Sequence, residues 1–204
     1  MIKYLLSILS FHLLLPGNGF SQIKLGFTSG VNFSYQRYEF NQYGNNSKRL
    51  KMMTGFNGGI LAKIPLSSMI RFQPSFQLSQ KGAKDSWIID NGIYEKEETL
   101  TYIEIQVPAH YLLNKLFFIG AGPVIGVASG GKITYNVFPD EDPFEIQQQR
   151  FDAGLLFQTG YELRQFQLSL AFNLGIVNQY KSDPRAVALF NRTFSVCFAY
   201  FLRK

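Results

Sequence analysis

The chain has 204 residues, of which 46% are hydrophobic, 16% aromatic and only 17% charged, and its formal net charge is +6. Intrinsically disordered chains combine low hydrophobicity with high charge, so this composition excludes disorder. A bundle of membrane-spanning helices needs apolar runs of about 18 residues or more, and the chain has none.

Residues 1–21 have the features of a secretory signal peptide. Lys3 supplies the positive start, and the apolar stretch 5–15 is too short to cross a bilayer as a helix. Small residues precede the expected cleavage site after Ser21. The alternative is an N-terminal anchor helix. Cleavage leaves His110 as the only histidine of the mature chain.

Cysteine usage and charge distribution exclude two further classes of protein. Cys197 is the only cysteine, so neither an internal disulfide nor a two-thiol metal or redox site can form. The basic residues of segment 37–51 are balanced by the acidic run 140–145. A nucleic-acid-binding protein normally has one dominant basic face. We therefore expect no nucleic-acid partner.

From residue 22 onward, apolar and polar residues alternate. In the first such stretch, Leu25, Phe27 and Val31 fall on one face, while Asn32 and Ser34 fall on the other. Alternation with period two is typical of a strand whose two faces meet different surroundings. The pattern predicts eight strands, at approximately 23–36, 56–64, 70–79, 103–111, 116–128, 151–163, 166–176 and 193–202.

The connections between these strands alternate in length. Short turns are expected at 65–68, 113–115 and 164–165, and long polar loops at 37–51, 81–98, 130–149 and 178–191. Short turns at one end, long loops at the other and an even number of strands are typical of an outer-membrane barrel. Residues 22–204 are therefore expected to form one domain, an all-β, eight-stranded antiparallel up-and-down transmembrane β-barrel.

A soluble barrel of the lipocalin kind also alternates, and it is the main alternative. Its polar face would meet bulk water and would be rich in Lys and Glu. Here the polar face is mostly Gly, Ser, Thr, Asn and Gln, which suits a narrow lumen filled by side chains. The large aromatic face then meets lipid. Interfacial girdles are expected to include Tyr35, Tyr111, Tyr161 and Tyr200.

Two prolines interrupt the expected strands. Pro74 and Pro123 fall in the middle of their strands, and proline cannot donate a ladder hydrogen bond. Proline within a sheet is normally found at edges or bulges, so these two positions are exceptions that the pattern alone does not explain.

The segment Phe72–Gly82, FQPSFQLSQKG, resembles a characteristic strand of the PorT-type outer-membrane barrels, a small barrel domain abundant in Bacteroidetes. The segments 102–108, 120–123 and 151–154 are similar to later strands of that family. The resemblance covers 23–202 and implies an outer-membrane location, periplasmic termini and prolines within strands. One member of the family serves a secretion and gliding apparatus, while most have no assigned activity.

Several charged residues fall on the polar face. Lys24, Lys63, Arg71 and Glu162 should lie near the short turns, and Glu104 and Asp152 farther from them. Buried charges are costly unless they are paired, so salt bridges are expected among this set. The alternative is a proton or ion pathway through the lumen.

Candidate catalytic and metal-binding residues are few. His110 is the one possible base for a nucleophilic serine, but it lies beside the short turn at 113–115, and we interpret it as a structural residue. The acidic run 140–145 lacks the spaced ligands and the glycine of a calcium loop, so we interpret it as a solvated loop tip. Cys197 is expected to face the lumen. We assign no catalytic, cofactor-binding or metal residue.

The sequence thus predicts a monomeric, non-enzymatic protein of the bacterial outer membrane. It would have a structural or interaction role, with accessory work for a secretion apparatus as one form. A partner would contact loops 37–51, 81–98, 130–149 and 178–191, and the barrel wall would contact outer-membrane lipids. The alternatives are a lipid-modifying enzyme and a narrow pore.

Overall fold

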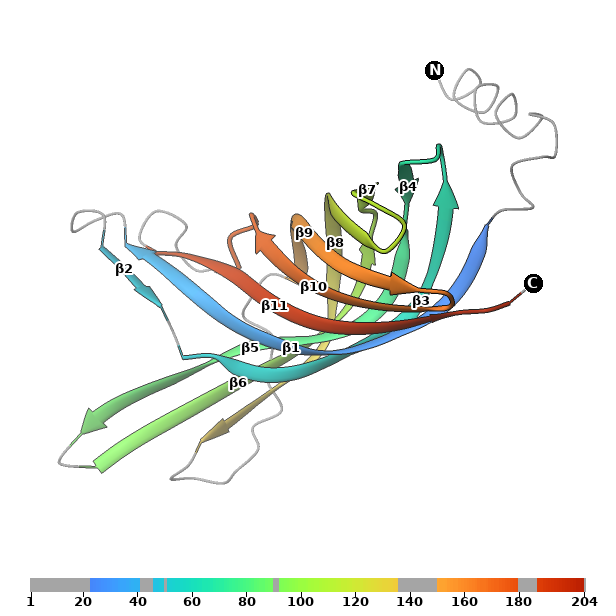
Figure 1. Ribbon diagram of the computed structural model, residues 1–204. Helices are drawn as coiled ribbons and strands as arrows, with labels where there is room; N and C mark the ends of the chain where they lie inside the picture. Colours follow the sequence, from blue (N-terminus) through green and yellow to red (C-terminus); the bar gives the residue numbers. More distant parts are fainter. Residues whose placement is uncertain are drawn as a thin grey trace, which may run out of the picture.

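The computed structural model describes residues 23–40, 46–49, 51–89, 92–135, 150–179 and 187–203 (Figure 1). The expected signal peptide 1–21 and the acidic run 140–145 lie outside these ranges. Among the described residues, no helix has the length and hydropathy needed to span a membrane. The strands are β1 Lys24–Phe40, β2 Asn46–Arg49, β3 Met53–Pro65, β4 Ile70–Phe72, β5 Ser75–Ile89, β6 Gly92–Gln106, β7 Ala109–Leu112, β8 Phe117–Tyr135, β9 Phe151–Leu163, β10 Phe166–Gly175 and β11 Val187–Phe201.

All strands pair antiparallel with their neighbours in one closed sheet. β1 pairs with β3 from Lys24↔Lys63 to Ser34↔Met53 on one side. On its other side it pairs with β11, from Gly26↔Phe201 to Phe40↔Val187. Because the first and last strands join, the sheet closes on itself, which satisfies the backbone groups at what would otherwise be open edges.

The closed sheet has eight positions around its circumference in the described part of the chain, because two pairs of labelled strands continue one another. β4 and β5 both pair with β3, and β7 and β6 both pair with β8. The short β2 pairs only with the far end of β1. The predicted eight-stranded up-and-down barrel is therefore confirmed, with two strands interrupted and a short strand added.

The interruptions explain the prolines. β4 and β5 are separated by Gln73 and Pro74, and β6 and β7 by Val107 and Pro108. The two breaks lie side by side, joined by a hydrogen bond of 3.0 Å from the Gln73 amide to the Pro108 carbonyl. Pro123 of β8 lies opposite the second break, where its carbonyl accepts from the Val107 amide at 3.0 Å. Pro74 and Pro108 thus lie within the two breaks and Pro123 faces one of them, so all three prolines fall where the regular strand pairing is interrupted.

The predicted assignment of side chains to the two faces is confirmed along all eight strand positions. Leu25, Phe27 and Leu168 are more than half exposed and point outward, whereas Asn32 and Ser169 are buried inside. An exterior of exposed Phe, Leu and Ile around a buried polar interior is the arrangement of a barrel surrounded by lipid.

The turns after β3, β7 and β9 lie at one end of the barrel, where β1 also begins and β11 ends; we call this the short-turn end. Aromatic side chains gather there on the exterior. Phe117 meets Tyr161 with ring centroids 5.0 Å apart, and Phe166 meets Tyr200 at 5.3 Å. Tyr111 is also exposed at this end, whereas Tyr35 lies far along β1, opposite Arg192.

At the opposite end, the prediction of a loop at 81–98 is wrong. β5 continues to Ile89 and β6 begins at Gly92, paired with each other throughout. β8 runs beside β6 up to Tyr135, so these three strands form a protruding sheet at this end, where β1 and β11 are also extended, up to Phe40↔Val187 (Figure 1). The other expected loops also contain strand residues, namely 37–40 and 46–49, 130–135, and 187–191.

Candidate functional site

The interior of the barrel at the short-turn end holds an ion cluster, here called the mouth cluster, formed by Lys63 of β3, Arg71 of β4 and Glu162 of β9. Lys63 Nζ lies 2.5 Å from Glu162 Oε1, and Arg71 Nη1 lies 2.5 Å from Glu162 Oε2. Both cations are buried, and the Glu162 side chain is 17% exposed. The expected salt bridges among these residues are confirmed. Lys24 is exposed at the rim of the same end.

His110 of β7 lies directly above this cluster and is fully buried. Arg71 Nε donates to its Nδ1 at 3.4 Å, so Nε2 carries the proton and donates to Gln158 Oε1 at 2.9 Å. The imidazole stacks on Phe118 with ring centroids 4.4 Å apart. Both ring nitrogens are therefore engaged by neighbours, as the interpretation of a structural histidine expects.

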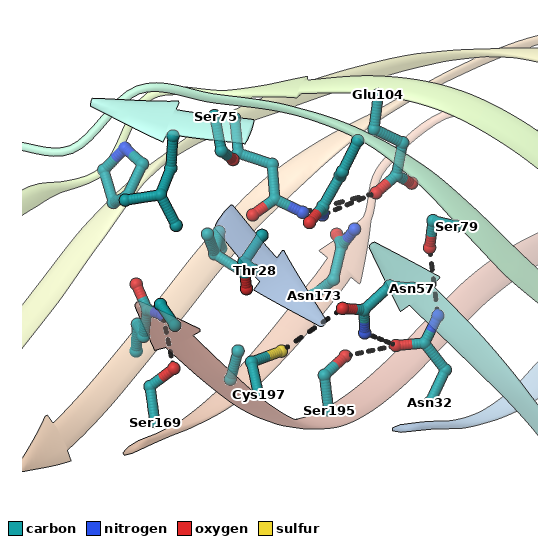
Figure 2. Close-up of a pocket in the computed structure, with 18 of the residues that line it drawn as sticks. Thr28, Asn32, Asn57, Ser75, Ser79, Glu104, Ser169, Asn173, Ser195 and Cys197 are labelled. Carbon is teal, nitrogen blue, oxygen red and sulfur yellow. Dashed lines mark hydrogen bonds between the residues drawn. The ribbon is translucent and has the colours of Figure 1, made fainter. Parts of the chain in front are cut away.

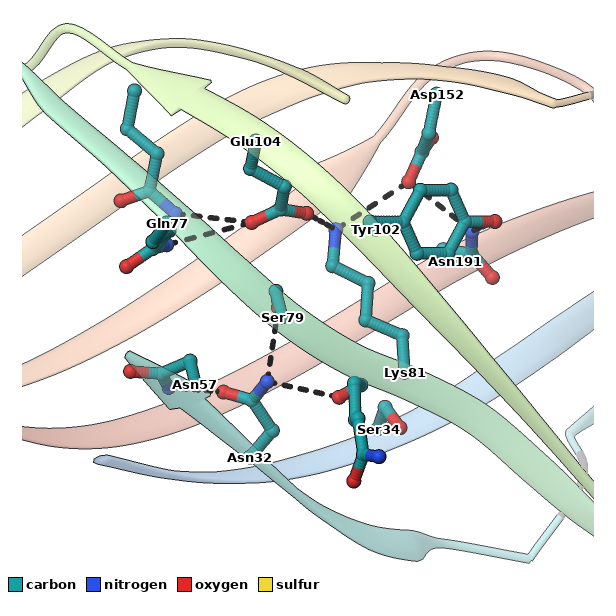
Figure 3. Close-up of polar contacts among 12 residues, drawn as sticks. Asn32, Ser34, Asn57, Gln77, Ser79, Lys81, Tyr102, Glu104, Asp152 and Asn191 are labelled. Carbon is teal, nitrogen blue, oxygen red and sulfur yellow. Dashed lines mark hydrogen bonds and ion pairs between the residues drawn. The ribbon is translucent and has the colours of Figure 1, made fainter. Parts of the chain in front are cut away.

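Farther from the short turns, Lys81 of β5 lies between two carboxylates. Its ammonium forms ion pairs with Glu104 of β6 and, at 3.4 Å, with Asp152 of β9 (Figure 3). All three side chains are at most 5% exposed. We call these residues the upper cluster. Glu104 and Asp152 lie where they were predicted, but Lys81 was assigned to the loop 81–98.

Neutral side chains complete the hydrogen bonding of the upper carboxylates. Asn191 and Gln179 donate to the two oxygens of Asp152 at 3.1 and 3.2 Å. Gln77 and Gln106 donate to Glu104 Oε2 at 3.4 and 3.3 Å. The extra negative charge of this cluster is thus stabilised by amide groups as well as by the one ammonium.

Between the two clusters, short polar side chains fill the lumen (Figure 2). Asn32 is the centre of this network: it accepts from Asn57 at 2.6 Å and from Ser195 at 2.7 Å, and it donates to Ser79 at 3.0 Å. The Cys197 thiol faces inward, as predicted, 3.5 Å from the Asn57 side-chain oxygen. The remaining cavity of about 40 Å³ has room for a few water molecules.

Three bulky aromatic side chains also point inward, which the alternation pattern did not predict. Tyr102, Phe118 and Phe201 are all fully buried. Phe118 fits because Gly160 lies opposite: a Cβ at Gly160 would come within 2.6 Å of the Phe118 ring. The parity of each position along its strand was a usable signal, since Tyr102 shares the parity of Glu104, and Phe118 that of Gly120.

Metal binding has no basis in the described ranges, where no group of three His, Cys, Asp or Glu side chains could hold an ion. The charged groups of the lumen instead contact one another. Chemically, the interior provides two ion clusters held by hydrogen bonds and, at the short-turn end, further cations around the opening.

A family model described as outer membrane protein beta-barrel domain matches residues 18–180. No curated protein matches the chain. The crystal structure of Neisserial surface protein A has a TM-score of 0.50 and 11% identity, covering 85% of this chain and 96% of that one. The crystal structure of Ail, the attachment invasion locus protein of Yersinia pestis, has a TM-score of 0.48 and 12% identity, and the match covers 88% of this chain and 98% of Ail. The crystal structure of the outer membrane protease OmpT of Escherichia coli has a TM-score of 0.35 and 9% identity, and the match covers 88% of this chain and 96% of OmpT. The likeness to Neisserial surface protein A shows a shared fold.

Proposed function

The chain belongs to the outer membrane protein beta-barrel domain family, and from this premise we propose that it is a monomeric, non-enzymatic protein that binds another component of the bacterial envelope through its protruding sheet. The short turns and both chain ends would face the periplasm, and the protruding sheet would face outward, which is the usual orientation of such barrels.

The observation that carries this proposal is the continuation of β5, β6 and β8 beyond the apolar wall. Outward residues within the wall, such as Phe76 and Leu78, are exposed and apolar. Farther along, Lys84 pairs with Glu97 at 2.8 Å and Lys51 with Glu95 at 3.6 Å. Partly exposed charges of this kind belong in water and not in lipid.

A paired sheet presents its side chains in fixed positions, whereas a loop must be ordered when it binds. Ordering flexible backbone costs about 1–2 kcal/mol per residue, so a surface that is already paired retains more of its contact energy. The protruding sheet is therefore better suited to recognition than the loop expected at 81–98.

Within the family, the segment Phe72–Gly82 favours the PorT-type group. In this chain the segment forms the end of β4, the proline kink and the first half of β5. Accessory binding to a secretion apparatus would be one form of the proposed role, with the apparatus as the partner.

The lipid-modifying alternative needs a base that reaches lipid, and the pore alternative needs an open lumen. The enclosed His110 and the filled interior favour binding over both. Lipid A mass spectra from cells with and without the protein should be identical, and a change that His110→Ala abolishes would instead support an enzyme. Stepwise conductance in planar bilayers would support the pore.

The binding role is tested by photo-crosslinking in intact cells. A photoreactive amino acid replaces Thr134, which is exposed on the protruding part of β8, or Leu168, which faces lipid in the wall. We expect a discrete protein or glycan adduct from position 134 and none from position 168. Equal patterns from both positions, or no adduct at either, would contradict the proposal.

A further inference from the structure

The short-turn end holds a cavity of about 670 Å³, between the turns after β3 and β9 and the ends of β1 and β11. Its charged lining residues are Lys24, Lys63, Arg71, Glu162, Arg164 and Arg203. Five cations therefore share one carboxylate, a surplus of four positive charges. Like charges brought together repel unless an anion joins them, so this lining favours a negatively charged ligand.

Each oxygen of the single carboxylate already contacts one buried cation. Glu162 uses one oxygen for Lys63 and the other for Arg71. Lys24, Arg164 and Arg203 are exposed around the opening of the cavity. An anion entering from that side would meet these three side chains first and the mouth cluster behind them.

Arg71 supplies the second, independent observation. It is 5% exposed, and it lines this cavity. Its Nε donates to His110 and its Nη1 to Glu162, but its Nη2 is buried and has no hydrogen-bond partner among the described residues. A buried donor without an acceptor is destabilising, and an anionic acceptor within the cavity would remove that cost.

The number and position of the donors indicate the chemical class of the anion. A phosphate group has several acceptor oxygens and up to two negative charges, which suits separate Lys and Arg donors better than a second carboxylate does. The cavity also has room for the group that carries the phosphate. The exterior aromatic pairs Phe117–Tyr161 and Phe166–Tyr200 place this end at the membrane interface, the level of lipid headgroups.

We infer that the mouth cavity is a phosphate-binding site in which Arg71 Nη2 and the rim cations Lys24, Arg164 and Arg203 contact the oxyanion. The phosphate would come from an anionic lipid headgroup or from solution, and the contacts are the same in both cases. This site is independent of the protruding sheet, so the binding role proposed above can fail without affecting it.

Calorimetric titration of the folded mature barrel in a neutral detergent tests the site. One arm uses inorganic phosphate and the other uses dihexanoyl phosphatidylglycerol, with dihexanoyl phosphatidylcholine as the reference lipid. Saturable binding of phosphate, or of phosphatidylglycerol in preference to phosphatidylcholine, supports the site and identifies the source. Absence of saturable binding in both arms overturns it.

The cations are tested by single substitutions. Arg71→Gln should weaken binding by about tenfold or more, since hydrogen bonds to charged groups are among the strongest. Arg164→Gln and Arg203→Gln should each weaken it by about two- to fivefold, as expected of exposed charges. These two leave the buried clusters intact, so they remain informative if Arg71→Gln does not fold.

Lys115→Gln is the matched control, because Lys115 lies in a turn at the same end and is not part of the cavity lining. It should leave the affinity unchanged. A loss for Lys115→Gln equal to those for Arg164→Gln and Arg203→Gln would mean that binding follows total charge, and would overturn the site. Glu162→Gln should strengthen phosphate binding by about threefold, because the Glu162 carboxylate competes with the phosphate for the same Lys and Arg donors.

Discussion

The upper cluster and the mouth cluster use the same kinds of side chain in opposite proportions. In the upper cluster one ammonium lies between two carboxylates, and amide groups donate to the oxygens that remain. In the mouth cluster two cations share one carboxylate, and one Arg71 donor has no partner among the described residues.

The difference shows how the barrel tolerates buried charge. The upper cluster is closed by neutral groups of the protein, so it serves as a structural crosslink between β5, β6 and β9. The mouth cluster opens into a cavity lined by further cations, so part of its charge remains available to a ligand. If this difference is real, substitutions in the two clusters should have unequal effects on stability.

The largest effect should come from Lys81→Met, which leaves Glu104 and Asp152 facing each other without a cation. Removing one partner of a buried ion network costs about 3–5 kcal/mol of folding free energy. Urea unfolding in lipid vesicles measures the loss, and retention of the compact band in unheated gels reports whether the barrel folds. The control is Lys84→Met, whose pair with Glu97 is partly exposed; it should cost about 1 kcal/mol or less. Similar losses for the two variants would show that the upper cluster is not a crosslink.

A second substitution tests the wall that separates both clusters from lipid. Leu170 faces outward at the middle of β10, opposite Thr159 of β9. Leu170→Arg should destabilise the barrel by about 2–4 kcal/mol, as for cations at the bilayer midplane. Leu163 also faces outward but lies beside a short turn, so Leu163→Arg should cost about 1 kcal/mol or less. The reverse order would contradict the assumed membrane position.

Glu162→Gln should have a smaller effect on stability than Lys81→Met. The mouth cluster is partly open to water, and we expect a loss of about 1–3 kcal/mol from the two cations left without their carboxylate. The same urea experiment at low and high salt sharpens the result. Salt should reduce the effect of Glu162→Gln and leave that of Lys81→Met nearly unchanged, because buried pairs are screened less. Equal salt dependence would mean that both clusters are closed.

Changes at Cys197, between the clusters, should have the smallest effect on stability. The labelling rate of its thiol tests whether water fills the lumen. A charged thiol reagent should label Cys197 on the order of a hundredfold more slowly than a cysteine at the mouth, because reaction requires access as well as thiolate. The comparison protein carries Ser67→Cys in a Cys197→Ser background, since Ser67 lines the mouth cavity. Comparable labelling rates would show a water-filled lumen and would support the pore.

Much of the fold could be predicted because period-two alternation continues through every strand position. It assigned the faces correctly, and it placed Lys63, Arg71 and Glu162 at one end. Lys81 was missed because its polarity suggested a loop, although it has the parity of the inward Gln77 and Ser79. Composition cannot show where paired strands stop when they leave the membrane, since polar residues suit both a loop and a sheet in water.

The inward aromatic residues and the mouth cavity depend on contacts across strands. Phe118 fits inside only because Gly160 faces it, and that match requires the register of β8 against β9. Five cations converge only because the ends of β1, β3, β4 and β11 meet the turn after β9. Such juxtapositions come from residues far apart in the sequence, and no local pattern records them.

The pairing of β1 with β11 determines how the protein must be made. Closure of the cylinder pairs Gly26 with Phe201 and Phe40 with Val187, so β1 gains its second neighbour only after β11 has been made, although β3 can pair with its other edge early. Until then β1 offers an exposed, aggregation-prone backbone edge. Closure of the barrel therefore depends on keeping this edge unpaired until β11 is available to complete the cylinder.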